Sequence, residues 1–430
     1  MNERLAGLRA ALLLLLAAAV GLLALGPAWG SPAPVLLDYW HIYGGDLKRA
    51  HEELIEQFNA SHPEIRVRYS YSGDPWTGWD KLILAIAART APDVALVEDY
   101  WTAKLAASGA LLELEGLIAK EGPAFRDDIY PLFSQSLTYQ GTIWALPYAM
   151  SNLLLYYNRD LFQQAGLNPA APPRTWDELV AAGPLLTKDL NGDGRPDQWA
   201  LSFPLTAQGG VVYYWLPFLW QGGGELFNAD CSEALFAGQE GVAALQFWLD
   251  LIYKQAIMPL SPPLEGFITG RVAMTLASSA KLTSYGSQIQ FELGVAPLPM
   301  NGRRATILGG KGLAILTQDE RKQRAAWEFI KWLTAPEQNL RWSTATGYIP
   351  IRLSVLSSLE FQEYLRENPG AEVALEELLY TRPRPVLAAY TEISRIMGLA
   401  LERALFGRED PQQVLLEAAV EAQQYLSSCD

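Results

Sequence analysis

The chain has 430 residues, of which 50% are hydrophobic and 19% are charged, and its 33 basic and 47 acidic residues give a net charge of −14. A half-apolar composition with 14 Trp, 19 Tyr and 14 Phe excludes an intrinsically disordered chain, and the length predicts two domains rather than one. The acidic balance excludes general nucleic-acid binding, because that function needs a cationic surface.

The first thirty residues have the pattern of an export signal. Two arginines, Arg4 and Arg9, precede an unbroken run of small and apolar residues from Ala10 to Leu25. A transmembrane anchor is the alternative, but this run is shorter than the ~20 residues that a membrane-spanning helix needs, and Pro27 follows directly. We therefore expect residues 1–30 to be a signal peptide and the mature protein to be exported, to the periplasm or the outer face of the cytoplasmic membrane.

Beyond residue 30, short apolar strands alternate with helices. Alternation of this kind predicts an α/β domain whose sheet is mostly parallel and covered on both faces. The predicted elements are a strand over 35–40, a helix over 46–58, a strand over 65–69, a helix over 81–89 and a strand over 93–97.

The pattern changes in the middle of the chain, where a proline interrupts an apolar stretch and a further strand follows over 153–157. We interpret residues Pro147–Ser151 as a crossing between two lobes. A short helix is predicted over 160–166, and Thr175 with Glu178 three residues later is typical of a capping box that opens the next helix.

The rest of the chain is mainly helical. Strands are predicted over 291–298 and 307–316, the second of them rich in glycine. An amphipathic helix over 319–333 follows, and the chain is predicted to end in a long helix over 411–426.

Residues that could carry catalysis lack a recognisable pattern. The three histidines, His41, His51 and His62, have no metal-ligand spacing, and we expect His51 and His62 on solvated surfaces. The two cysteines, Cys231 and Cys429, form no metal site; in an exported protein they either pair or remain thiols, and their spacing decides neither. No nucleophile elbow, phosphate-binding loop or zinc-protease motif is present, so no residue is assigned a catalytic role.

Three segments carry a resemblance to a known family. Residues 156–162 (YYNRDLF), 173–179 (PRTWDEL) and 220–227 (WQGGGELF) resemble the signature of the family 1 extracellular solute-binding proteins of ABC importers. Within that family, further segments are similar to the glycerol-3-phosphate and glycerophosphodiester-binding proteins. These segments include residues 58–60, 276–279, 307–310, 346–351, 367–371 and 411–415.

The resemblance implies an α/β fold of the type II periplasmic-binding-protein class, with two lobes joined by hinge crossings and the ligand in the cleft between them. It places an N-terminal lobe at 31–149 plus 294–333 and a C-terminal lobe at 150–293 plus 334–430. It also implies a monomer that needs no cofactor and delivers a small molecule, a phosphate ester or a sugar, to the membrane permease subunits of an ABC transporter.

The family's ligand contacts fall on named positions of this chain. The resemblance implies hydroxyl contacts from Ser151 and Ser278, a backbone N–H at Gly310, a phenol at Tyr348, an aromatic wall at Trp176 and a phosphate-pairing arginine at Arg395. A guanidinium fork, hydroxyls and unobstructed N–H groups are what a phosphate oxyanion needs. Each residue also has an ordinary structural role open to it, as a solvated arginine, a turn serine or a packed aromatic ring.

Two positions depart from the family pattern. Trp79 is the nearest counterpart of a family tyrosine, with Trp76 as its rival, and Asp99 stands where the family has a glutamate. A shorter carboxylate leaves room for a larger head group, for a water, for a glycerol hydroxyl or for a cation such as choline near Trp79. Glycerol 3-phosphate, a glycerophosphodiester and a sugar therefore all remain open as ligands.

Two alternatives stand beside a phosphate-ester ligand. In the first, the same fold binds a neutral, maltodextrin-like oligosaccharide stacked on Trp79, Trp101 and Trp176. In the second, the protein is an exported hydrolase, since carboxylate pairs leave a glycosidase open by residue type.

A separate loop reproduces most of a calcium-binding pattern. Its candidate ligands are Asp189, Asn191, Asp193 and Asp197, with Gly192 and Gly194 between them. The bidentate glutamate at the twelfth position is replaced by Ala200. A structural Ca²⁺ and a self-bonded surface turn are equally open.

Overall fold

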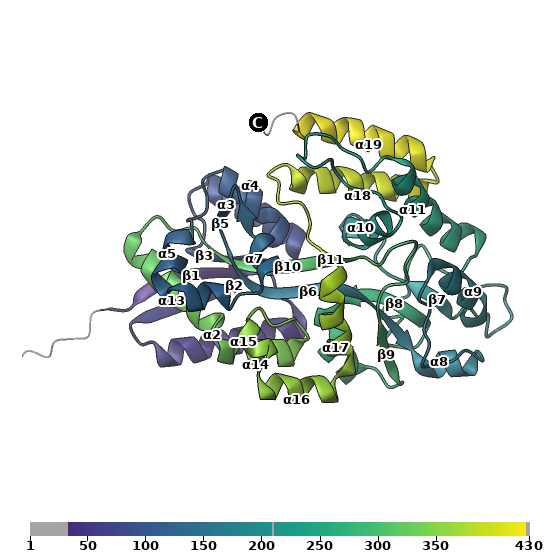
Figure 1. Ribbon diagram of the computed structural model, residues 1–430, viewed down its shortest axis with the longest axis horizontal. Helices are drawn as coiled ribbons and strands as arrows, with labels where there is room; N and C mark the ends of the chain where they lie inside the picture. The colour runs from purple at the N-terminus through teal and green to yellow at the C-terminus, as the bar shows by residue number, and fades with distance from the viewer. Residues whose placement is uncertain (1–32, 209, 427–430) are drawn as a thin grey trace, which may run out of the picture.

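One β-sheet runs through both lobes of the molecule (Figure 1). The computed structural model describes residues 33–208 and 210–426, and its main sheet has the strand order β2-β1-β3-β10-β6-β8-β7, with β9 paired to β6 and β11 paired to β10. The strands are β1 (Val35–His41), β2 (Ile65–Tyr71), β3 (Val94–Glu98), β6 (Leu146–Asn158), β7 (Trp199–Ser202), β8 (Val272–Ser278), β9 (Leu293–Ala296), β10 (Thr306–Ile315) and β11 (Thr381–Arg382), and a separate hairpin of β4 (Thr138–Tyr139) and β5 (Thr142–Ile143).

Helices cover both faces of this sheet (Figure 1). In the first half of the chain they are α2 (Gly45–Ser61), α3 (Pro75–Ala87), α4 (Asp99–Ala107), α5 (Glu115–Glu121), α6 (Pro123–Asp127), α7 (Pro131–Gln135), α8 (Arg159–Gln164), α9 (Trp176–Leu186) and α10 (Val211–Gln221). In the second half they are α11 (Gln239–Leu249), α12 (Leu282–Gln288), α13 (Glu320–Leu333), α14 (Pro336–Thr346), α15 (Leu353–Leu356), α16 (Leu359–Glu367), α17 (Pro369–Glu376), α18 (Tyr390–Gly407) and α19 (Pro411–Leu426). A short π-helix, η1 (Asp250–Lys254), and two short 3₁₀-helices, η2 (Ser279–Lys281) and η3 (Glu377–Tyr380), complete the set.

The sheet is mixed, so the prediction of a mostly parallel sheet was wrong for its centre. Parallel pairing holds between β1 and its neighbours β2 and β3, and between β7 and β8. The central strands β6 and β10 run antiparallel to each other, and β10 is also antiparallel to β3. The reason is that β6 and β10 carry the chain from one lobe to the other in opposite directions, whereas helical crossovers within a lobe produce parallel pairs.

The two central strands are the hinge crossings between the lobes. Residues 146–152 of β6 pair with β10, while residues 153–158 pair with β8 and β9. Every residue of β6 is buried, as expected of a strand covered on both faces. The predicted crossing at Pro147–Ser151 lies within β6 and is confirmed.

Each lobe has its own hydrophobic core. One cluster contains Leu37, Leu96 and Phe329, and the other contains Trp215, Trp248 and Leu401. The predicted division assigned residues 334–430 to the C-terminal lobe, but Trp342 and Tyr348 of that range pack in the first cluster because α14 lies against α2. The remaining lobe boundaries stay predictions.

Local signals in the sequence account for several helix starts. The hydroxyl of Thr175 accepts a hydrogen bond from the Glu178 N–H at 3.1 Å, so the predicted cap of α9 is confirmed. Helix α3 begins at Pro75, earlier than the predicted start at residue 81, because the Asp74 carboxylate accepts hydrogen bonds from the N–H groups of Trp76 and Thr77.

The expectation of a solvated His51 was wrong. Its side chain is fully buried, and its two ring nitrogens contact the hydroxyls of Tyr39 at 2.7 Å and Tyr148 at 2.8 Å. The sequence favoured a surface position because charged residues surround it, but the face of α2 that carries His51 packs on β1 and β6.

Two predictions fall on residues that lie outside the described part of the chain. These are the signal peptide at 1–30 and any pairing that involves Cys429. None of the helices within residues 33–208 and 210–426 combines the length and the apolar composition that crossing a membrane requires.

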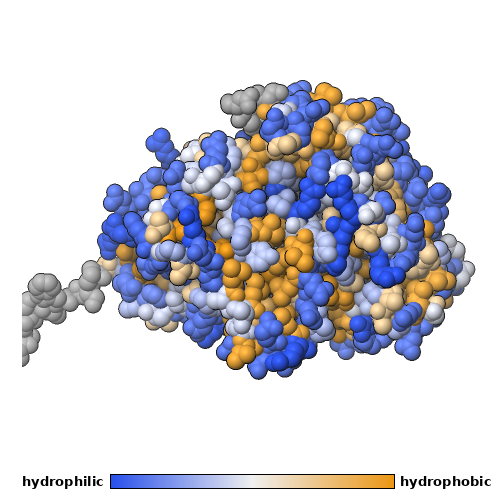
Figure 2. Space-filling view, in the orientation of Figure 1, coloured by the Kyte–Doolittle hydropathy of each residue, from blue (hydrophilic) through white to orange (hydrophobic). Residues whose placement is uncertain are grey.

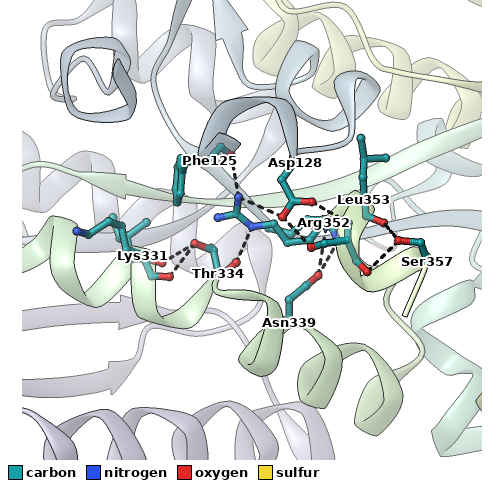
Figure 3. A network of polar contacts seen from close by, with 11 residues as sticks. Phe125, Asp128, Lys331, Thr334, Asn339, Arg352, Leu353 and Ser357 are labelled. Atoms are coloured by element: carbon teal, nitrogen blue, oxygen red, sulfur yellow. Dashed lines mark hydrogen bonds and ion pairs between the residues drawn. The ribbon is translucent and has the colours of Figure 1, made fainter. Parts of the chain in front are cut away.

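A buried arginine fastens the segment after α14 to the first lobe (Figure 3). Arg352 is 2% exposed; its Nε–H donates to the Thr334 carbonyl at 2.8 Å and an Nη1–H donates to the Phe125 carbonyl at 2.9 Å. Its guanidinium also lies 4.3 Å from the ring centroid of Phe125, and the Asn339 side chain accepts from the Arg352 N–H at 3.3 Å. These contacts fix the chain four residues after Tyr348, which lines the cleft described below.

Apolar surface gathers in the middle of the face that carries α14, α15 and α17 (Figure 2). The segments from α15 to η3 include exposed apolar side chains, among them Leu353, Leu359 and Leu379. Beneath them, α17 and the central strands share a third core cluster that includes Met150, Ile349 and Ala374. This cluster joins the two lobes along the hinge strands.

Candidate functional site

A cleft of about 570 Å³ lies where the two lobes meet over the central strands. The first lobe contributes Asp74 to Trp76 from the start of α3, and Glu98 and Tyr100 from the end of β3 and the start of α4. The second contributes Tyr213 from α10, Ser278 from the end of β8 and Lys281 from η2. The central strands and the segments beside them supply Ser151, Gly309, Gly310, Lys311, Tyr348 and Arg384.

The floor of the cleft is kept open by two adjacent glycines of β10. A Cβ atom on Gly309 would come within 3.0 Å of the Tyr213 hydroxyl and 3.2 Å of the Ser151 hydroxyl, and one on Gly310 would come within 2.6 Å of the Met150 side chain. The Ser151 hydroxyl donates to the Gly309 carbonyl at 3.3 Å. Only glycine therefore leaves the backbone and these hydroxyls accessible to a ligand at this point.

Both buried cations of the cleft are paired with neighbouring carboxylates. Lys311 lies 3.0 Å from Glu98, and Arg384 forms an ion pair with Asp99 while also lying 3.9 Å from Glu98. Burial alone would lower the pKa of Lys311, but the Glu98 carboxylate outweighs it and the pKa is raised. The charges of this part of the cleft therefore balance.

Asp99 has the most perturbed carboxyl group of the cleft. It is 3% exposed, and burial together with nearby Glu98 raises its pKa to about 6, although Arg384 and the Tyr100 N–H act in the opposite direction. A buried carboxyl group with a raised pKa, paired with an arginine that lines a cleft, is a typical mark of a functional site.

An aromatic recess of about 60 Å³ continues the cleft beside Arg384. Its walls are formed by Trp76, Trp79, Tyr100, Trp101, Tyr213 and Tyr390, with the hydroxyl-bearing residues Thr391 and Ser394 at one side. The guanidinium of Arg384 lies 4.3 Å from the ring centroid of Tyr100 and 5.7 Å from that of Tyr213. Such rings offer a stacking surface to a sugar face or a contact to a cation.

Several buried polar atoms around the cleft have no hydrogen-bond partner among the described residues. They include the second carboxylate oxygen of Asp99 (Oδ2), the Nε–H of Arg384 and the hydroxyl of Tyr213. Buried polar groups are normally satisfied, so a set of unsatisfied donors and acceptors around one cavity indicates capacity for a polar ligand.

Six of the eight predicted ligand contacts are brought together here. Ser151, Ser278, Gly310 and Tyr348 line the cleft, Asp99 adjoins it through Arg384, and Trp79 lines the recess. The ligand-binding role of each of these residues stays a prediction.

The structure does not bring Trp176 and Arg395 to the cleft. The Trp176 ring stacks on Phe247 with centroids 4.1 Å apart, and its Nε1–H donates to Gln221 at 2.8 Å, so it belongs to the core of the second lobe. Arg395 lies on the solvent side of α18, where its side chain is 45% exposed and its Nε–H donates to Glu392 at 3.2 Å.

Sequence reasoning missed three residues of the cleft: Arg384, Lys311 and Tyr213. Arg384 lies in an Arg-Pro-Arg-Pro run at 382–385, where prolines favour an extended backbone that could have been read as a connection rather than a helix. Lys311 directly follows the glycine pair that the sequence did single out. Tyr213 carries no comparable signal, because an aromatic residue in an apolar helix resembles core.

The predicted calcium loop is exposed and is held by its own hydrogen bonds. The Asp189 carboxylate accepts from the N–H groups of Gly192 at 2.7 Å and Gly194 at 2.8 Å, and Asp197 accepts from Leu190 and Asn191. Across residues 33–208 and 210–426, no three or more His, Cys, Asp and Glu side chains are grouped as metal ligands. The role of Asp193 and its neighbours as Ca²⁺ ligands stays a prediction.

Comparison with known proteins adds independent information. Residues 53–368 match the model of a family described as bacterial extracellular solute-binding protein. The sn-glycerol-3-phosphate-binding periplasmic protein UgpB of Pectobacterium atrosepticum is 28% identical over 411 residues, which cover 91% of each chain.

Two solved structures share the whole architecture. UgpB from Mycobacterium tuberculosis in complex with glycerophosphocholine has a TM-score of 0.82 and 27% identity, covering 92% of this chain and 99% of the other. The cyclic alpha-maltosyl-1,6-maltose binding protein from Arthrobacter globiformis has a TM-score of 0.75 and 29% identity, covering 91% and 99%. Proteins of this architecture therefore include binders of a phosphodiester and of a sugar.

Proposed function

The chain belongs to the bacterial extracellular solute-binding protein family, and we propose that the solute it binds is glycerol 3-phosphate or a glycerophosphodiester such as glycerophosphocholine. As a member of this family it is the solute-binding component of an ABC importer, and its partners are a small molecule and the membrane permease. We further propose that it acts as a monomer, in the periplasm or at the outer face of the cytoplasmic membrane, and without a catalytic step.

The observation that carries the ligand assignment is the buried guanidinium of Arg384, which lines both the cleft and the aromatic recess. Its Nε–H has no partner among the described residues, and the hydroxyl-bearing residues Ser151, Ser278 and Tyr348 line the same cavity. A guanidinium is the side chain best suited to bind a phosphate, because its N–H groups match the spacing of the phosphate oxygens. The open backbone at Gly309 and Gly310 provides room for the ligand beside it.

The proposed mechanism follows from the two hinge strands. A phosphate ester enters between the lobes and contacts Arg384 on the side of α18 and the floor formed by β6 and β10. Contacts to both lobes favour the closed arrangement over the open one, and the closed form is presented to the permease.

A neutral oligosaccharide is the second candidate ligand, and a specific observation favours it. The aromatic recess beside Arg384 offers rings on which a sugar face stacks, while the cleft cations Lys311 and Arg384 already have carboxylate partners. A ligand of this kind would need no free positive charge.

Calorimetric titration of three proteins distinguishes the candidates. Wild type, Arg384→Ala and Arg395→Ala are titrated with glycerol 3-phosphate, glycerophosphocholine and maltotriose. For a phosphate ester, Arg384→Ala should weaken binding by about 2–5 kcal/mol, which is about 30-fold or more, because a desolvated charge contact is lost. Arg395→Ala is the matched control on the same segment of chain and should leave the affinity unchanged.

Two other results of the titrations would change the assignment of the phosphate-binding residue or of the ligand. Binding of a phosphate ester that weakens in Arg395→Ala but not in Arg384→Ala would return the phosphate contact to the residue predicted from family resemblance. Binding of maltotriose alone, with affinity insensitive to salt, would replace the phosphate ester with the sugar.

A further inference from the structure

An internal carboxylate occupies the position at Arg384 that the proposed phosphate would need. The guanidinium of Arg384 forms an ion pair with Asp99, and both side chains are almost completely buried, at 11% and 2% exposure. The pair joins α4 of the first lobe to the segment that leads into α18 of the second. A hydrogen bond between the same two elements lies nearby, because the Thr391 hydroxyl donates to the Tyr100 carbonyl at 3.0 Å.

The groups around Asp99 leave no spare positive charge for an anion. Arg384 and Glu98 are its charged neighbours, and Lys311, the next cation, is paired with Glu98. The hydroxyl groups of Tyr100, Tyr213 and Tyr390 face the same pair. A phosphate that enters this group of balanced charges must therefore share or take over the guanidinium of Arg384.

We infer that Asp99 is a resident counter-ion that competes with the ligand phosphate for Arg384, and that phosphate binding is completed by transfer of one proton from solvent onto the Asp99 carboxylate. This inference rests on the proposed function and names Asp99 as a specificity-determining residue of the same site. In this step the Asp99 carboxylate and one H⁺ form a neutral carboxylic acid. The phosphate then supplies the negative charge that pairs with Arg384. The protonated Asp99 is able to donate a hydrogen bond to the ligand.

The surroundings of Asp99 favour proton uptake when a phosphate binds. The pKa of Asp99 is already raised to about 6 by burial and by Glu98, with Arg384 opposing the rise. When a phosphate takes part of the interaction with Arg384 and adds its own negative charge, the opposition weakens and the pKa of Asp99 rises further. Affinity for the anion should then increase as the pH falls from 8 towards 6, by up to about tenfold per pH unit for one linked proton.

A neutral polyol can bind without protonation of Asp99. One hydroxyl can donate to the unpartnered Oδ2 of Asp99 while another accepts from the Nε–H of Arg384, with the ion pair left intact. The carboxylate at this position thus penalises an anion and favours a hydroxyl, and removing its charge should shift the preference of the site towards phosphate esters.

Glycerophosphocholine is the appropriate probe for the test. A phosphate monoester has a second pKa near 6 and would itself change charge over the range of interest, whereas a diester has no such second ionisation. Its binding is measured by calorimetry at pH 6.5 and 7.5, at each pH in two buffers with different ionisation enthalpies, so that protons taken up are counted directly. The proteins are wild type, Asp99→Asn and Asp38→Asn.

The expected result is proton uptake by wild type and by the control, and none by Asp99→Asn. Asp38 is the matched control because it forms an ion pair with Arg68 at 2.8 Å on the exposed part of β1, outside the cleft. Asp99→Asn should also bind glycerophosphocholine more tightly, by tenfold or more at pH 7.5, and its affinity should no longer change with pH. Melting temperatures of the three proteins verify that each is folded.

Two results would overturn the inference. Equal affinity and equal proton exchange in wild type and Asp99→Asn, or weaker binding by Asp99→Asn, would show that Asp99 does not compete with the ligand, while the proposed function would stand. If no phosphate ester binds wild type at either pH, the proposed function fails and this inference fails with it.

Discussion

Two buried histidines link the stability of the first lobe to pH. His41 is fully buried next to Glu52, and the Tyr43 N–H donates to its Nδ1, so that nitrogen must be unprotonated. Burial, with a smaller contribution from Lys48, lowers the pKa of His41 to about 4, and burial also lowers the pKa of His51. Both rings are therefore neutral in the folded protein at physiological pH.

The free energy of unfolding should fall as the pH decreases from about 6.5 to 4. The unfolded chain binds protons at these histidines below pH 6.5, whereas folded His41 does so only near pH 4, so the stabilisation present above 6.5 is lost across this window. His41 alone contributes about 3 kcal/mol to this change. Denaturant unfolding of wild type and His41→Gln at several pH values measures it.

The control for this prediction is His62→Gln, because His62 is only partly buried, at the end of α2, and lies apart from the buried pair of His41 and His51. This variant should keep the pH dependence of wild type, while His41→Gln should show a flatter one. Identical slopes for wild type and His41→Gln between pH 4 and 6.5 would contradict the assignment and leave the carboxylates as the cause.

At the residue scale, the sequence identified the kinds of group in the site better than their positions. Ser151, Ser278, Gly310 and Tyr348 were placed from short segments next to turns and strands, where family resemblance keeps register well. Arg395 was chosen from a helix, where a change of one position moves a side chain by about 100° around the axis, from a buried face to solvent. Arg384 lies in the extended segment 382–385, which has no helical periodicity from which the direction of its side chain could be predicted.

At the scale of single elements, helix α3 sets the position of the aromatic wall. Its N-cap Asp74 accepts from Trp76 N–H at 2.9 Å and from Thr77 N–H at 3.1 Å, and α3 carries both Trp76 and Trp79 to the recess. Helix α13 has the same kind of cap: Asp319 accepts from Arg321 and Lys322 N–H groups at 2.8 and 3.1 Å, away from the cleft.

Comparing variants of the two caps distinguishes an effect on protein stability from an effect on ligand binding. Asp74→Ala should lower the free energy of unfolding by about 1 kcal/mol, and Asp319→Ala should lower it as well, because each substitution leaves two N–H groups without their acceptor. Only Asp74→Ala should also weaken ligand binding, since it loosens the turn that positions Trp76. Urea denaturation and calorimetry measure the two effects; equal ligand affinities in both variants would show that the wall does not depend on the cap.

The start of α3 was predictable and was nevertheless missed. An Asp followed by Pro at the first helical position is a strong start signal, but the glycines and aromatic residues around it resemble a loop. The mixed centre of the sheet was a harder problem. Alternating strands and helices predict parallel pairs, and nothing local to 306–315 reveals that β10 returns to the first lobe between β3 and β6.

At the scale of the whole molecule, the two lobes share one sheet and should unfold together. Strands β6 and β10 pair with each other along the hinge and with strands of both lobes at their ends, so neither lobe can lose its half of the sheet alone. We expect a single denaturant transition, with tryptophan fluorescence and far-UV circular dichroism giving coincident midpoints. Two separated transitions would show that the lobes are independent folding units.

The two-lobe plan itself was available only through resemblance. Length predicted two domains, but composition and periodicity predict domains in tandem, and the interleaving of chain segments came from the family signature. The balance of charges in the cleft was beyond sequence reasoning, because Glu98, Asp99, Lys311 and Arg384 come from three distant parts of the chain.

The interleaved chain also fixes the order in which the protein can be completed as it is synthesised. The core of the first lobe contains Leu37 together with Trp342 and Tyr348, and Arg352 fastens this late segment in place. A growing chain that has not yet reached these residues lacks part of the core around its own first strand. Such dependence on distant segments slows folding, so the nascent polypeptide remains without a finished lobe until most of its length has been made.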